Sequence, residues 1–127
     1  MPNHLVREIE NLKKNILSLS ALVEGTLQRS VKALKELDPA LAQSVIDADY
    51  EIDHREVEIE EECLKIIALH QPVATDLRFI IAVLKINSEL ERIGDAAVNI
   101  AERAVFLARQ ERTADSFDFP GMAEKAQ

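Results

Sequence analysis

Pro39 and Pro72 are the only prolines between residues 3 and 110, and their spacing constrains the fold more than any other feature of the sequence. A proline inside a helix removes a backbone donor and clashes with the preceding turn, so helices begin or end beside it. The chain has only three glycines and is rich in Ala, Leu, Glu, Lys and Arg, which favour helix. The sequence therefore predicts three long helices, at about residues 3–37, 39–69 and from 73 or 75 to 110.

Apolar side chains recur at helical spacing in each predicted helix, which indicates a core-facing stripe on each. In the first helix the stripe consists of Leu5, Ile9, Leu12, Ile16, Leu19 and Val23. In the second it consists of Val45, Ile46, Ile52, Val57, Ile59, Cys63, Leu64 and Ile67. In the third it consists of Leu77, Ile80, Leu84, Val98, Val105 and Phe106. Because short connections join long helices, we expect an all-α, antiparallel up-down-up bundle over residues 1–110.

Residues 111–127 form a segment of different character. Residues 113–116 are typical of a loop, whereas Phe117, Phe119 and Met122 resemble the opening of another helix. We expect a linker followed by the beginning of a fourth helix, and hence a fragment of a longer protein.

Composition argues against several functions. A net charge of −8 disfavours direct binding to nucleic acid, which requires a basic surface. No apolar run approaches the ~20 residues of a membrane-spanning helix, so we expect a protein that is not membrane-embedded. The single cysteine, Cys63, provides no disulfide framework, and a reduced cytoplasmic location follows. The sequence has no Gly-rich phosphate loop and no convincing pair of nucleophile and base, so we do not expect an enzyme.

Acidic residues provide nine of the sixteen positions between residues 47 and 62, and they divide between two faces of the predicted helix. Those on the outer side form an ordinary solvated face: Glu51, Glu58, Glu61 and Glu62. Those on the apolar face are Asp49, Asp53, Glu56 and Glu60. The third helix repeats this pattern with Glu91, Asp95 and Glu102 on its apolar face, flanked by Asn87 and Asn99.

The two acidic sets are predicted to meet at one level of the bundle. Asp49 and Asp53 lie 24 and 20 residues before Val73, and Glu91 and Asp95 lie 18 and 22 residues after it. Four converging carboxylates repel one another and require cations. We therefore predict a metal site for iron, zinc, manganese or magnesium, with more than one ion where carboxylates bridge. Further ligands, or residues that support the ligands, are Glu56, Asn99 and Glu102.

Other interpretations of these carboxylates remain open. This end of the bundle could be open to water, or Arg78 or Arg92 could reach across to the carboxylates. Glu51 and His54 have the Glu-x-x-His spacing of ferritin-like di-iron bundles. Those proteins use two such motifs, and both residues are predicted to point outward here. A carboxylate-bridged di-metal enzyme or metal store is thus one alternative function, and a metal-free helical interaction module is another.

A second apolar stripe runs along the third helix at intervals of seven residues: Phe79, Ile86, Ile93, Ile100 and Leu107. A three-helix bundle needs one buried face per helix, so this stripe either widens the same core or forms an interface. The interface would face a missing second half or another subunit, and we predict a homodimer.

Several segments of the sequence resemble the PhoU family, and the resemblance covers residues 4–110. The segments are DYEID at 49–53 with Glu56, QPVATDLR at 71–78, ERIGD at 91–95 and NIAE at 99–102. The resemblance implies that the chain is one repeat of the usual two three-helix bundles. It also implies that (Glu/Asp)-x-x-x-Asp pairs bind metal ions, and these pairs are Asp49 with Asp53 and Glu91 with Asp95.

The same resemblance implies a role in bacterial phosphate sensing. Family members link the ATPase subunit of the phosphate ABC transporter to a membrane histidine kinase, and they repress the phosphate-starvation response when phosphate is plentiful. We therefore expect a metal-binding regulatory adaptor that is cytoplasmic and is brought to the inner membrane by its partners. Residues 117–127 would then begin the first helix of the second repeat.

Overall fold

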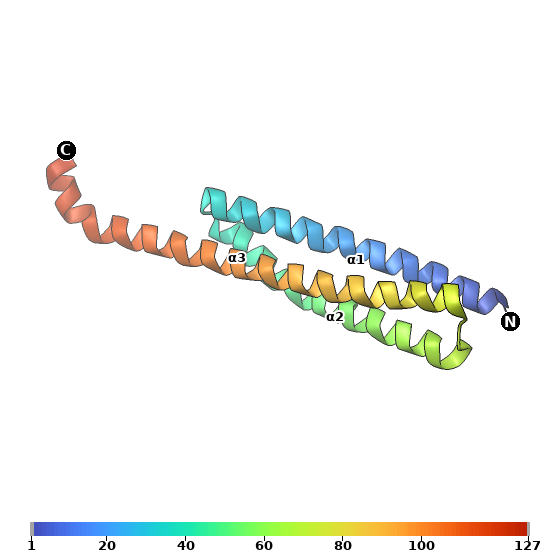
Figure 1. Cartoon of the computed structure of the whole chain (residues 1–127). Coiled ribbons are helices and arrows are strands. Elements are labelled where there is room, and N and C mark those ends of the chain that lie inside the picture. The colour runs from blue at the N-terminus through green and yellow to red at the C-terminus, as the bar shows by residue number, and fades with distance from the viewer. Residues whose placement is uncertain (1, 127) are drawn as a thin grey trace.

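The computed structural model describes the backbone of residues 2–126 and the side chains of residues 4–113. Its three helices are α1 (Pro2–Glu36), α2 (Pro39–His70) and α3 (Ala74–Ala126), and they pack side by side in an antiparallel bundle (Figure 1). The described backbone contains no strand. The prediction of an all-α bundle of three long helices is confirmed.

The turn between α1 and α2 forms where the sequence predicts it, at Asp38-Pro39. Leu37 adopts a positive φ of 50°, and the Asp38 N–H donates to the Ala33 carbonyl at 2.9 Å, which ends α1. The Asp38 carboxylate then accepts a hydrogen bond from the Leu41 N–H at 3.0 Å and caps α2. Pro39 follows at the first helical position, where its missing N–H costs nothing.

The second turn occupies residues 71–73. Gln71 takes a left-handed conformation with a φ of 45°, and its N–H donates to the Ile67 carbonyl at 3.0 Å. Pro72 follows and prevents α2 from continuing. This short connection keeps α2 and α3 antiparallel neighbours, so residues at equal distances from the turn lie at the same level.

The core consists of two parts with different side chains. Near the α2–α3 turn and in the middle of the bundle, large aliphatic residues such as Leu12, Leu19 and Ile66 are completely buried. Near the α1–α2 turn the buried residues are mostly small: Ala33, Ala42, Val45, Ala97, Ala101 and Ala104. The predicted stripe of α1 is confirmed, with Leu12, Ile16, Leu19 and Val23 all buried and Leu5 and Ile9 partly buried.

Three residues predicted to face the core are exposed instead. Val57 is 50% exposed, Leu64 54% and Phe106 56%. Each lies at the edge of the apolar stripe of its helix. In a bundle of only three helices, the part of each helix surface that the other two helices cover is narrower than this stripe. The predicted stripes of α2 and α3 were therefore too wide.

The structure also differs from the expectation at the C-terminal end. We expected a linker after Gln110, whereas α3 continues as a helix to Ala126 and extends past the α1–α2 turn (Figure 1). Residues 113–116 contain neither proline nor glycine, and extending an existing helix avoids the cost of nucleation. The assignment of residues 111–127 to the beginning of a second repeat stays a prediction.

A first testable prediction concerns Gly94, a buried glycine in the interior of α3. A Cβ atom there would lie 3.7 Å from Ile52 Cγ2 and 4.0 Å from Asp49 Oδ1, which are ordinary van der Waals distances. Gly94→Ala is therefore expected to raise the unfolding free energy by about 1 kcal/mol, because alanine loses less conformational entropy in a helix. Urea denaturation measures this, and Gly25→Ala in open space on α1 is the matched control. A loss of stability at Gly94 alone would contradict the prediction.

Candidate metal centre

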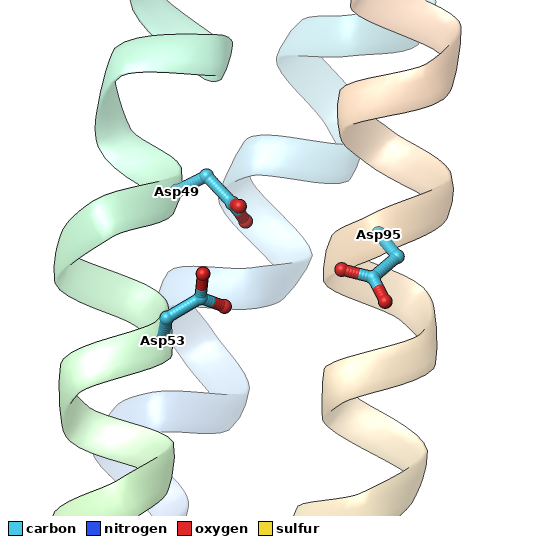
Figure 2. Close-up of side chains that lie close together, drawn as sticks. All are labelled: Asp49, Asp53 and Asp95. Carbon is cyan, nitrogen blue, oxygen red and sulfur yellow. The ribbon is translucent and has the colours of Figure 1, made fainter.

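Asp49, Asp53 and Asp95 form a cluster between α2 and α3. Asp49 and Asp53 are one turn apart on α2, and Asp95 faces them from α3 (Figure 2). One carboxylate oxygen from each residue lies within 4.8 Å of the others. Asp49 is half-buried, while Asp53 and Asp95 are exposed to solvent. The three aspartates therefore lie at the solvent-exposed edge of the α2–α3 interface, where an ion can enter from water.

The cluster lies at one end of a groove of about 310 Å³ between the two helices. Carboxylates, an amide and a hydroxyl dominate its lining, and two aliphatic side chains complete it. The lining residues are Asp53, Glu56, Val57, Glu60, Leu84, Asn87, Ser88, Glu91 and Asp95. Oxygen atoms of this kind are the ligands preferred by hard and borderline divalent cations.

Electrostatic repulsion and burial raise the pKa values of two groups here. Burial raises the pKa of Asp49 above its ordinary value, and the charges of Asp53 and Asp95 raise it further. Burial also raises the pKa of Glu56 to about 7, with added repulsion from Asp53 and Glu91. Negative charge at these positions is thus unfavourable in the protein alone, and a bound cation would relieve it.

Three oxygen atoms in or beside the groove are buried without a hydrogen-bond partner: Asp49 Oδ1, Glu56 Oε2 and Asn87 Oδ1. Buried polar atoms normally have partners, because leaving one unsatisfied costs free energy. Asn87 is held in place by its other end, since its Nδ2 donates to the Glu56 carbonyl at 2.9 Å. Unpaired oxygens beside a carboxylate cluster fit a metal ion.

The structure does not support the alternative in which an arginine neutralises the cluster. Arg92 pairs with Glu89 on its own helix at 3.1 Å. Among the side chains described for residues 4–113, none of the ion pairs joins a basic residue to Asp49, Asp53 or Asp95. The other alternative, a site open to water, agrees with the exposure of Asp53 and Asp95.

The remaining predicted site residues are distributed along and beyond the groove. Glu91 lines it without joining the three aspartates, so three of the four predicted ligands are brought together and not all four. Glu56 also lines the groove and is 6% exposed. Asn99 and Glu102 are exposed and do not line it. Most of these carboxylates are more exposed to solvent than their helical positions predicted, because only a narrow part of each helix surface is buried in the core.

Sequence reasoning did not assign Asn87 and Ser88 to the site. Asn87 is four residues before Glu91, which places both on one face of α3, and Ser88 lies beside it. This spacing was a signal that could have identified Asn87.

Glu51 and His54 point away from the groove, as predicted from their positions on the helix. The Glu51 carboxylate lies 3.9 Å from Arg55, and His54 Nε2 lies 3.4 Å from Glu58. Their side chains are more than 60% exposed. The Glu-x-x-His spacing therefore contributes no ligand to the groove in this structure.

The fold and the groove together define a class of protein: a bundle of long helices with a carboxylate-rich groove on one face. The sequence-family model of the PhoU domain matches residues 16–104, and the chain belongs to this family. Within residues 2–126, none of the helices is long and apolar enough to cross a membrane.

Several phosphate-specific transport system accessory proteins are similar to this chain in sequence. The phosphate-specific transport system accessory protein PhoU homolog of Aquifex aeolicus (strain VF5) is 44% identical over 106 residues, which are 84% of this chain and 48% of that protein. The homolog of Pseudomonas putida is 44% identical over 81% of this chain and 40% of that protein. PhoU of Escherichia coli (strain K12) is 38% identical over 77% of this chain and 41% of that protein. The chain thus spans less than half the length of these relatives.

A solved structure agrees with these relationships. The crystal structure of PhoU from Pseudomonas aeruginosa superposes with a TM-score of 0.80 and 41% sequence identity. The match covers 82% of this chain and 50% of that one. The chain therefore corresponds to one repeat of proteins about twice its length.

Proposed function

We propose that this protein is a metal-binding regulatory adaptor in bacterial phosphate uptake and signalling. Its partners would be the ATPase subunit of a phosphate ABC transporter and a phosphate-sensing histidine kinase. In this role it represses the phosphate-starvation response when phosphate is plentiful. The names of the relatives, which are phosphate-specific transport accessory proteins, support the pathway.

The single observation that carries the metal-binding part is the cluster of three aspartates within 4.8 Å, with Asp49 Oδ1 buried and unpaired. Asp49, Asp53 and Asp95 would hold an iron, manganese, zinc or magnesium ion, and Glu91 could join a second ion along the groove. The ion would offset the repulsion among these carboxylates. An adaptor needs no catalytic group, and the accessory names of the relatives agree with such a role.

The proposed function is tested by binding and by a reporter. The purified ATPase subunit and the cytoplasmic part of the histidine kinase are each titrated against this chain, with metal and with chelator. A phosphate-starvation reporter is measured in a bacterium that lacks its own family member, with and without this chain. Binding to either partner together with repression in high phosphate is expected. Absence of both binding and repression would refute the proposed role.

A further prediction concerns self-association through the stripe of α3. Ile86 and Ile93 are 44% and 37% exposed, whereas Phe79, Ile100 and Leu107 are partly buried, so part of the stripe widens the core. Because two large apolar residues stay exposed, we expect a homodimer that covers them. Sedimentation at micromolar concentration should give about twice the chain mass. Ile86→Glu combined with Ile93→Glu should give a monomer, and a dimer that persists in this variant would contradict the prediction.

A further inference from the structure

A line of three exposed apolar side chains runs along the outside of α2 beside the acidic groove. It consists of Tyr50, Val57 and Leu64, spaced seven residues apart, and we name it the α2 ridge. These side chains are 81%, 50% and 54% exposed. A spacing of seven residues keeps side chains on one line of a helix, which is the pattern that packs against a second helix. None of the three belongs to the core clusters of the bundle.

Acidic side chains flank the ridge on both sides. Asp53 and Glu60 lie on its groove side, three residues after Tyr50 and Val57, and both are exposed. Glu61 is exposed on the opposite side, four residues after Val57. Three basic residues lie near the ridge, and each contacts or adjoins other groups. Arg55 donates to Ser18 Oγ on α1 at 2.6 Å and so faces away from the ridge. His54 Nε2 lies 3.4 Å from Glu58, and Lys65 lies beside Glu61 and Glu62. The surface around the ridge is therefore apolar along its centre and negative at its edges.

The groove beside the ridge can receive a long basic side chain. Val57 and Leu84 line it and can contact the aliphatic part of a lysine or arginine. Glu56 Oε2 and Asn87 Oδ1 are buried there without hydrogen-bond partners, and an ammonium or guanidinium group can donate to both. Glu56 lies about one turn beyond Asp53, on the side away from Asp49. This end of the groove therefore extends beyond the cluster of three aspartates and shares Asp53 with it.

We propose that the α2 ridge and the adjoining groove form a docking surface for an amphipathic helix of another protein. That helix would carry an apolar line against the ridge and a line of Lys or Arg side chains toward Glu60 and the adjoining end of the groove. Charge complementarity selects this occupant, because a second copy of α2 would place acidic residues against acidic residues. The proposal goes beyond metal binding and phosphate regulation, since it specifies the chemistry of a partner.

The test uses a labelled synthetic peptide of three heptads as the probe. It has leucine at one position of each heptad, lysine three positions later, and alanine or glutamine elsewhere. A second peptide has glutamate in place of lysine. Fluorescence anisotropy should show that the lysine peptide binds the protein roughly tenfold or more tightly than the glutamate peptide, and that the difference shrinks at high salt. Equal binding of the two peptides would overturn the proposal.

Matched variants locate the binding surface. Val57→Gln combined with Leu64→Gln should weaken binding of the lysine peptide at least roughly tenfold. Val6→Gln combined with Leu17→Gln, at two exposed apolar residues of α1, should leave it unchanged. Wild-type affinity in the first variant would overturn the proposal. So would a change in sedimentation mass caused by the first variant, because a second copy of the chain would then be the occupant.

A measurement on the wild-type protein tests the proposal even if the variants fail to fold. Amide NMR signals of the wild-type protein near Asp53, Val57, Glu60 and Leu64 should shift when the lysine peptide is added. Shifts confined to other regions would overturn the proposal. Metal content determined in the same samples separates this result from the metal proposal, since peptide binding can fail while metal binding persists.

Discussion

Replacing Asp95 by asparagine is expected to remove most of the stabilisation that a metal ion gives this protein, while stabilising the metal-free form. A ligand that binds only the folded state adds about 2.7 kcal/mol at a roughly hundredfold excess over Kd. If the loss of one carboxylate ligand raises Kd about a hundredfold, the same metal concentration adds only about 0.4 kcal/mol. Without metal, the substitution removes a charge that raises the pKa values of Asp49 and Glu56, so the unfolding free energy increases.

Thermal melts in chelator and in excess metal, together with elemental analysis, measure both effects. Asp47→Asn is the matched control, because Asp47 is exposed on the same helix and accepts a hydrogen bond from Gln43 outside the groove. It should change neither metal content nor the difference between the two melts. If Asp95→Asn lost equal stability in both conditions and kept its metal content, the aspartate cluster would have a structural role alone. Metal affinity should also fall as pH drops toward ~4–5, because ligating carboxylates must be deprotonated.

Replacing Glu56 by glutamine is expected to stabilise the metal-free protein at pH 8 and to have little effect near pH 4. Burial raises the pKa of this carboxyl from its ordinary value of 4.5 to about 7. Below both values the group is protonated in the folded and the unfolded states, so it imposes no penalty. Between pH 4.5 and about 7 this carboxyl group is ionised in the unfolded chain and still protonated in the folded chain. The unfolding free energy of the wild type therefore falls as pH rises through this range. Above pH ~7 the full penalty, on the order of 3 kcal/mol, is present.

Urea denaturation of both proteins in chelator, at pH 4 and pH 8, measures this difference. Glutamine has the shape of a protonated glutamate and carries no charge, so the variant should show a flatter dependence of stability on pH. Glu61→Gln is the control, since Glu61 lies on the same helix and is exposed. A loss of stability at both pH values in Glu56→Gln would show that the Glu56 side chain is stabilising, contrary to the prediction.

The turns and the aspartate cluster could be predicted because both follow from short-range rules. Pro39 and Pro72 can hardly lie inside a helix, and the caps at Asp38 and Gln71 form beside them. Once the second turn is placed, the level at which Asp53 and Asp95 meet follows from the rise per residue of a helix. No knowledge of packing is needed for either conclusion.

The depth of each residue could not be predicted in the same way. Helical periodicity gives the direction of a side chain but not the width of the buried arc, which depends on how three helices pack together. Val57 and Leu64 therefore seemed to belong to the core, whereas they form part of an exposed ridge. Glu91 was expected to reach the aspartates, but it lines the groove one turn away from Asp95. The continuation of α3 beyond Gln110 was missed because the weak loop signal of residues 113–116 cannot end a helix that is already formed.

The three aspartates lie on two different helices, and this placement affects the rate at which the metal-bound protein would unfold. An ion bound by Asp49 and Asp95 would act as a cross-link that closes a loop of 46 residues, from position 49 to position 95. An unfolded chain that kept the ion between these two residues would lose entropy worth about 4 kcal/mol in closing a loop of that length, so the bound ion opposes separation of the two residues. Separating α2 from α3 would require the ion to leave or to lose ligands first. The metal would then control how long the folded chain survives, and not only how stable it is at equilibrium.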